Sequence, residues 1–208
     1  MTTAAACARD IVDYWLGASP EGPAAADAER ERWYRGGPEV DREIRTRFAE
    51  RVAEARAGRL AEWESTPEGA LAVVVLLDQF TRNIYRGTAQ AYCGDALALA
   101  VAGGALAIGH DRALSIPGRI FLLHPFHHSE SLAEQERGVA LLRSLEPLAP
   151  PAWRAYVRRA VEGFARHRDV VARFGRFPHR NRVLGRASTP EEIAYLEQEP
   201  ASYGQGSG

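Results

Sequence analysis

The 208-residue sequence contains no lysine, so all 26 of its basic side chains are arginines. This absence excludes chemistry that needs an ε-amino group: Schiff-base and pyridoxal-phosphate enzymes, Walker-type phosphate loops and the protein-kinase fold. Cysteine is also scarce. Cys7 and Cys93 show no Cys-x-x-Cys spacing, which argues against a disulfide framework or a cysteine zinc site.

Long hydrophobic runs are missing as well. The apolar runs at residues 69–77 and 96–109 both fall short of the roughly 18 residues that a membrane-spanning helix needs. The first fifteen residues lack the charged and apolar regions of a secretory signal. With 46% hydrophobic and 25% charged residues, the sequence predicts a globular protein with no membrane partner, and we expect it in the cytoplasm.

Positive charge is concentrated in one segment, although the formal net charge is only −1. Residues 166–186, called the basic segment below, contain seven arginines and one acidic residue. The following residues, 187–208, contain four acidic residues and no arginine. The near-neutral total therefore conceals a local candidate for anion binding.

Helical periodicity dominates the chain, and no stretch alternates apolar and polar residues as a half-buried strand does. The predicted class is all-α, with stacked antiparallel helical hairpins. A buried central helix should follow the Thr66-Pro67 start, and a long helix should end at Gly175. We expect the helix after Pro117 to be disturbed at Pro125. Residues 1–200 should form one domain, followed by a disordered tail at residues 201–208.

Two capping boxes are predicted, in which an N-cap hydroxyl and a glutamate three residues later bond each other's backbone. Ser131 and Glu134 could start one helix. Thr189 and Glu192 could start the last one.

The first polar cluster continues the most hydrophobic helix of the chain. Asp78 and Arg82 are four residues apart and share a helix face, as do Gln79 and Asn83. One interpretation is a buried ion pair that fixes the end of a core helix. In the other, Arg82, Asn83 and Arg86 bind a ligand, while Asp78 and Gln79 hold them from behind.

The second polar cluster is rich in histidine. His124 and His128 have the spacing of two metal ligands on a helix, but Pro125 weakens a continuous helix there, so no metal site is predicted. We expect His128 to be a neutral acid/base group held by Glu130 or another neighbour. Alternatively, a nearby serine caps a helix and His127 lies in solvent.

The third cluster is the basic segment itself, where a glycine and a proline bracket a sharp turn. Guanidinium groups bind carboxylates and phosphates through two parallel hydrogen bonds, so such a corner is a candidate anion clamp. Alternatively, these arginines bond helix carbonyls or pair with acidic residues elsewhere. The candidate side chains are His167, Arg173, Arg176, His179 and Asn181.

Three long motifs, at residues 68–92, 119–142 and 167–196, together resemble the bacterial family catalogued as domain of unknown function 924. The resemblance extends over nearly the whole chain. It implies an all-helical fold similar to the tetratricopeptide-repeat superfamily, without the sequence repeat. It implies no particular reaction.

These observations favour a protein that binds a small anionic metabolite in one pocket and that could act on it as an acid/base enzyme without a cofactor. Arg82, Arg173 and Arg176 would bind the anion, and His128 with Glu130, or His179, would move a proton. The alternative is a tetratricopeptide-like module that binds a protein or peptide in a concave face. Nucleic-acid binding is not expected, since the net charge is −1.

Overall fold

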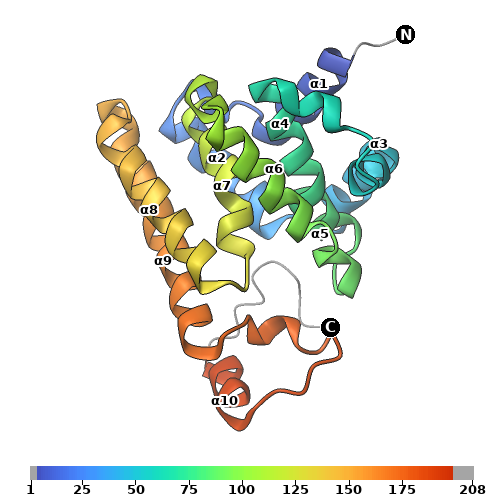
Figure 1. Cartoon of the computed structure of the whole chain (residues 1–208), viewed down its shortest axis with the longest axis vertical. Coiled ribbons are helices and arrows are strands. Elements are labelled where there is room, and N and C mark those ends of the chain that lie inside the picture. Colours follow the sequence, from blue (N-terminus) through green and yellow to red (C-terminus); the bar gives the residue numbers. More distant parts are fainter. Residues whose placement is uncertain (1–3, 199–208) are drawn as a thin grey trace.

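The structure is a computed structural model that describes residues 4–198, and every regular element in that range is helical (Figure 1). The predicted all-α class is therefore confirmed. No helix within the described range is both long and apolar enough to cross a bilayer. The α-helices are α1 (Ala4–Leu16), α2 (Pro23–Arg35), α3 (Pro38–Arg56), α4 (Pro67–Val74), α5 (Thr81–Ile84), α6 (Asp95–Ala107), α7 (Ile116–His128), α8 (Leu132–Leu148), α9 (Arg154–Phe174) and α10 (Pro190–Gln198).

The central helix is α4, as the sequence predicts. Pro67 begins it, and the hydroxyl of Thr66 caps it by accepting a 3.1 Å hydrogen bond from the amide of Gly69. Residues 69–77 are all buried, and α4 packs against α1, α6 and α7. The hydrophobic run thus forms the middle of the core rather than a surface face.

Two predicted helix ends are confirmed in detail. Gly175 stops α9 in the left-handed region, with φ of +70°, where a residue without Cβ is least strained. At the start of α10, the amide of Thr189 donates to the carboxylate of Glu192 over 2.8 Å, and the amide of Glu192 donates back to the Thr189 hydroxyl over 3.2 Å. This is the expected capping box.

Two expectations about α7 and α8 are wrong. The helix α7 continues through Pro125 to His128; the proline is buried in the core, and packing around it offsets the lost backbone hydrogen bond. Ser131 is the N-cap of α8 but makes no capping bond with its side chain. Instead, the side-chain amide of Gln135 donates to the carbonyls of His127 and Ser129, each over 2.7 Å, and joins the two helices.

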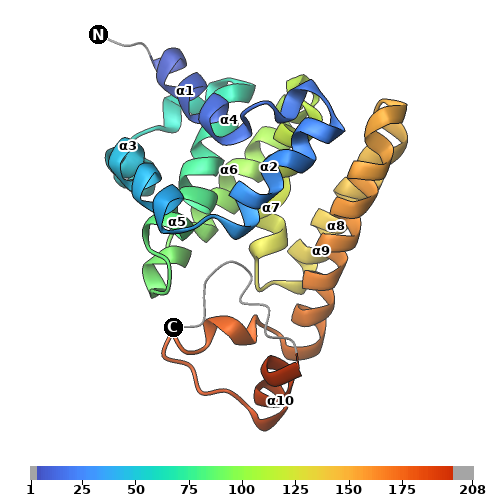
Figure 2. The same cartoon turned by 180° about the vertical axis from the view of Figure 1, so that it is seen from behind.

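The helices α8 and α9 form a long antiparallel hairpin along one side of the molecule (Figures 1 and 2). This hairpin agrees with the expected stacking. A tetratricopeptide-like superhelix is compatible with the arrangement and stays a prediction, as does a domain boundary at residue 200. The expected disordered tail, residues 201–208, lies outside the described residues.

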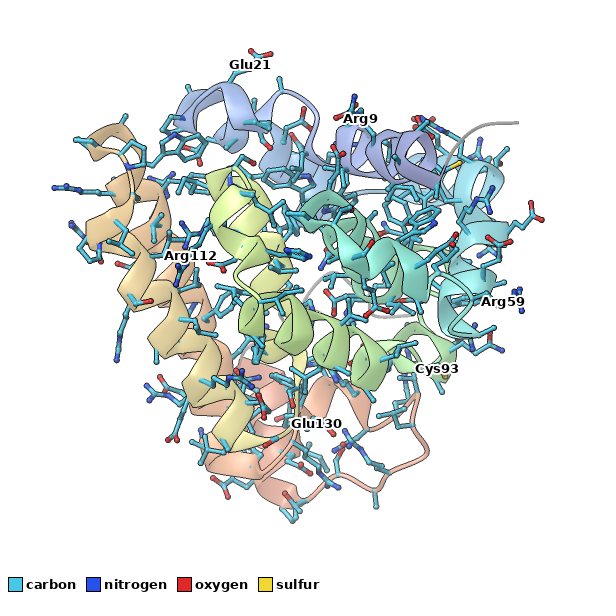
Figure 3. The ribbon with its side chains drawn as sticks, turned by 45° about the horizontal axis from the view of Figure 1, so that its top comes forward. Arg9, Glu21, Arg59, Cys93, Arg112 and Glu130 are labelled. Carbon is cyan, nitrogen blue, oxygen red and sulfur yellow. The ribbon has the colours of Figure 1, made fainter. Side chains whose placement is uncertain are left out.

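The chain beyond α9, residues 175–198, is called the C-terminal segment below. It contains the short 3-10 helix η7 (Pro178–Arg180) and α10, and it lies under the ends of α7, α8 and α9 (Figure 2). Figure 3 places Glu130 in the connection between α7 and α8, next to this segment. Its carboxylate accepts from the amide of Phe177 over 2.8 Å and pairs with Arg186 over 2.6 Å, so it attaches the segment to the helical body.

Candidate functional site

The first polar cluster lies on an unusual helical turn. Residues Val75–Phe80 form a π-helix, η3, between α4 and α5, and π-turns inside α-helices are frequent at functional sites. Asp78 is completely buried in η3, and its carboxylate lies 3.2 Å from a guanidinium nitrogen of Arg82. It also accepts a hydrogen bond from the side-chain amide of Gln79. The buried ion pair that the spacing indicates is therefore present.

The carboxylate of Asp78 also holds His128, at the end of α7. The Nδ1 atom of His128 lies 2.7 and 3.0 Å from the two carboxylate oxygens. Burial, together with the positive charge of Arg82, lowers the pKa of His128 well below 6.5. The imidazole is therefore neutral: Nδ1–H donates to Asp78, and Nε2 keeps its lone pair. The partner of His128 is thus Asp78 rather than Glu130.

Two arginines and a second carboxylate complete this network. Arg82 binds Asp95 through two hydrogen bonds of 2.9 and 3.1 Å. Arg180, from η7, lies 3.3 Å from the same carboxylate and donates to the carbonyl of His128 over 2.9 Å. With Asp78, the two guanidinium groups and two carboxylates balance in charge, which permits their burial.

Gly94 explains how Asp95 reaches this network. An added Cβ atom at residue 94 would lie 2.3 Å from the backbone oxygen of Leu77 in η3, closer than any side chain permits. Only glycine allows the start of α6 to approach the π-helix this closely. The approach places Asp95 beside Arg82.

A cavity of about 340 Å³ opens next to these residues, between α2, α5, α7, α9 and η7. Its walls contain aromatic rings, two side-chain amides and many cations, but no carboxylate from the described residues. The arginines are Arg30, Arg82, Arg86, Arg159, Arg166 and Arg180. The histidines are His124, His127, His128, His167 and His179.

All five cavity histidines have lowered pKa values, because burial disfavours the charged imidazolium. The pKa falls to about 3 for both His167 and His179. His127 is buried and packs against His167, with the ring centres 3.7 Å apart. In the described part of the chain, no three His, Cys, Asp or Glu side chains are arranged to hold a metal ion.

Many of the residues proposed from the sequence converge on this cavity. Asp78 lies directly behind it, in contact with His128 and Arg82. Those that line it are Gln79, Arg82, Asn83, Arg86, His128, His167 and His179. The first and second polar clusters thus meet in one place, together with part of the basic segment.

Four other proposed residues lie outside the cavity, so the expected anion site at Arg173 and Arg176 is not part of it. Arg173 pairs with Glu191 over 2.8 Å, and Arg176 pairs with Glu192 over 2.7 Å. Asn181 donates to Glu192 over 3.2 Å. Arg173 and Glu130 thus attach the C-terminal segment to the helical body, and Arg176 and Asn181 bond Glu192 within it. Pairing of these arginines with acidic residues is the alternative interpretation of the basic segment.

The cavity also contains residues that the sequence interpretation missed. Tyr34 and Arg30 come from α2 and Arg159 from α9. An ion pair of 2.8 Å between Asp27 and Arg159 joins these two helices. Residues so far apart in sequence give no local pattern. Arg180, by contrast, belonged to the basic segment and could have been selected there.

The chain belongs to the family described as "Bacterial protein of unknown function (DUF924)", whose profile matches residues 11–200. This confirms the resemblance found in the sequence. The chain is similar to a solved structure of a protein of unknown function, ATU0120, from Agrobacterium tumefaciens. The two chains are 39% identical with a TM-score of 0.79, over 94% of this chain and 99% of the other. No curated protein matches the chain.

Proposed function

We propose that the cavity binds a small anionic metabolite and that His128 exchanges a proton with it. The observation that carries the proposal is the lining: six arginines and five neutral histidines, with no carboxylate among the described residues. A volume of about 340 Å³ lies within the range of roughly 300–1,000 Å³ typical of small-molecule sites. We place the protein in the cytoplasm, where such metabolites occur.

Two of the arginines are available for a ligand. Arg82 and Arg180 share Asp95, Arg86 pairs with Asp41 over 2.7 Å, and Arg159 pairs with an aspartate of α2. Arg30 and Arg166 form no ion pair within residues 4–198. Both residues are exposed, so an anion in the cavity could pair with them without displacing an acidic side chain of residues 4–198.

His128 is suited to accept a proton. Asp78 fixes its ring and leaves Nε2 with a lone pair. In the empty cavity, burial and the cations keep its pKa low. A bound anion adds a negative charge nearby, which raises the pKa and makes His128 a better base. The ligand would thus activate the group that acts on it.

The first test measures the melting temperature of the protein with phosphate, succinate or citrate, each at up to about 10 mM. A ligand that binds the native state stabilises it against unfolding. We expect at least one anion to raise the melting temperature by several degrees. Arg166→Gln should reduce this shift. Arg168→Gln is the matched control on the same helix, because Arg168 pairs with Asp169 over 2.7 Å outside the cavity.

No shift with any of these anions, nor with phenyl phosphate or benzoate, would overturn the proposal. The peptide-binding alternative predicts the opposite pattern, in which an acidic peptide stabilises the protein and the small anions do not. The proton-transfer part has its own readout. Nitrogen NMR of His128 should report a neutral ring without ligand and a raised pKa when the anion is bound.

A further inference from the structure

The wall formed by α9 has no side-chain volume at its centre. Tyr156, Ala160, Gly163 and His167 line the cavity at helical spacing, and Gly163 is the one glycine of α9. Glycine in a helix interior destabilises the helix by about 1 kcal/mol relative to alanine. Outside the backbone of α9, an added Cβ at residue 163 would meet one atom of residues 4–198 within 4 Å, a guanidinium nitrogen of Arg166 at 3.8 Å. Apart from this group, the described residues leave the space in front of Gly163 open down to the helix backbone.

The other walls of the cavity present flat rings. Tyr34 of α2 stacks on His124 of α7, with ring centres 6.5 Å apart and an angle of 25° between the rings. His127 packs on Phe164, with ring centres 4.3 Å apart. Rings arranged in this way favour a planar ligand group, which gains by offset stacking as well as by burial of apolar surface.

The two arginines that form no ion pair within residues 4–198, Arg30 and Arg166, adjoin these walls. The guanidinium group of Arg30 lies 5.3 Å from the ring centre of Tyr34. Arg166 lies one helical turn beyond Gly163 and reaches the open space in front of it. Arg30 therefore provides a cation beside the ring of Tyr34, and Arg166 provides one beside the backbone of α9 at Gly163.

We propose that the ligand is an aromatic or heteroaromatic anion: its ring lies against α9 at Gly163, and its acidic group is bound by Arg30 and Arg166. This inference rests on the proposed anion binding and adds the class of ligand. The rest of the molecule would face the wall where His128 and the amides of Gln79 and Asn83 line the cavity.

The test compares anions that share an acidic group and differ by a ring. Phenyl phosphate is paired with inorganic phosphate, and benzoate with acetate, by calorimetric titration of the full chain. Burial of a ring should make at least one ring-bearing anion bind about tenfold or more tightly than its partner. Equal affinities within both pairs would overturn the inference.

A cavity-filling variant locates the ring. Gly163→Leu places a side chain in the open space, so phenyl phosphate should bind about tenfold or more weakly. The empty protein should melt at or above the wild-type temperature, because leucine favours the helix. Gly104→Leu is the matched control: Gly104 is exposed in α6, outside the cavity, and an added Cβ there meets no atom of residues 4–198 beyond its own helix backbone within 4 Å. It should leave phenyl phosphate binding unchanged.

The outcomes separate the two proposals. If neither the ringless nor the ring-bearing anions bind, anion binding itself fails and the ring inference fails with it. If phosphate and acetate bind as tightly as their ring-bearing partners, anion binding stands and only the ring inference fails. If Gly163→Leu binds phenyl phosphate as tightly as the wild type, the ring does not lie at Gly163.

Discussion

The Nδ1 atom of His128 lies 2.7 Å from the carboxylate of Asp78, a residue 50 positions earlier that is completely buried. This contact joins the π-helix η3 to the last turn of α7, and it orients the ring by one of its two nitrogens. The same carboxylate also contacts Arg82. One buried charge therefore supports both the candidate base and the cation network beside it.

Replacement of Asp78 by asparagine should destabilise the protein. The side chain keeps its shape, but Arg82 and Arg180 are left with one carboxylate between them in a buried site. Removal of one partner from a buried ion pair costs about 3 kcal/mol. Urea denaturation at neutral pH should therefore show a free energy of unfolding lower by about that amount.

Asp169→Asn is the control for this measurement. Asp169 forms a one-to-one ion pair with Arg168, and its side chain is 65% exposed. Exposed pairs contribute about 0–1 kcal/mol, so this variant should unfold almost as the wild type does. Equal losses in the two variants would contradict the buried network as the source of stability.

Acid should destabilise the protein well before carboxylates become protonated. The five cavity histidines have pKa values below 6.5 in the folded state, about 3 for His167 and His179. The unfolded chain binds these protons near pH 6.5, so stability present above that pH is lost as the pH falls towards 3. Each proton that the unfolded chain binds and the folded protein does not changes the free energy of unfolding by about 1.4 kcal/mol per pH unit.

Denaturation curves measured from about pH 7.5 to about pH 5 check this dependence of stability on pH. The free energy of unfolding should decrease steeply below about pH 6.5. His167→Gln removes one titrating group, so its slope should be smaller by about 1.4 kcal/mol per pH unit. An unchanged slope would mean that His167 is protonated in the folded protein.

Local patterns explain how much of the fold was predictable. Proline and threonine at Thr66-Pro67 define the start of α4, and Thr189 with Glu192 defines the start of α10, because such signals act within one turn. Pro125 misled the prediction, since packing around α7 outweighs a local helix-breaking tendency. The π-helix η3 has no sequence signature of its own; it depends on its neighbours in the core.

The candidate site was predictable only where its residues are close in sequence. The spacing of Asp78 and Arg82 indicated their ion pair correctly. The link from Asp78 to His128 depends on how α7 packs against η3, and no pattern along the chain contains it. Similarly, Arg173 and Arg180 look alike in the basic segment. Only their tertiary contacts differ: Arg180 lines the cavity, and Arg173 pairs with Glu191.

Gly94→Ala should disturb the network through the backbone. The new Cβ would meet the backbone oxygen of Leu77 at 2.3 Å, so the start of α6 must move away from η3. Such overpacking typically costs about 1–3 kcal/mol, and it displaces Asp95 from Arg82. We expect a lower melting temperature. Gly104→Ala should show no such decrease, because its added Cβ meets no described atom outside its own helix backbone within 4 Å.

Two neighbouring glutamates should differ sharply in how they hold the C-terminal segment. Glu192 is buried and accepts from Arg176 over 2.7 and 2.9 Å, from the amide of Thr189 and from Asn181. Glu191 forms one exposed pair with Arg173. Glu192→Ala should therefore release α10 and expose residues 187–198 to proteolysis and hydrogen exchange, whereas Glu191→Ala should not.

The pH dependence of this segment distinguishes it from the histidine cavity. The hydrogen bonds from Arg176 and the Thr189 amide lower the pKa of Glu192 to about 2. A lowered carboxylate pKa contributes stability above the usual value, about 4.3, and this contribution is lost as the pH falls towards 2. In the wild type, the ionisation of Glu192, and with it the protection of α10 from exchange, should therefore change only in that acidic range. In Glu192→Gln, protection should be weaker at neutral pH already, since the amide cannot form the charged pair with Arg176. Equal protection of α10 in Glu192→Gln and the wild type at neutral pH would show that the Arg176 pair does not hold the segment.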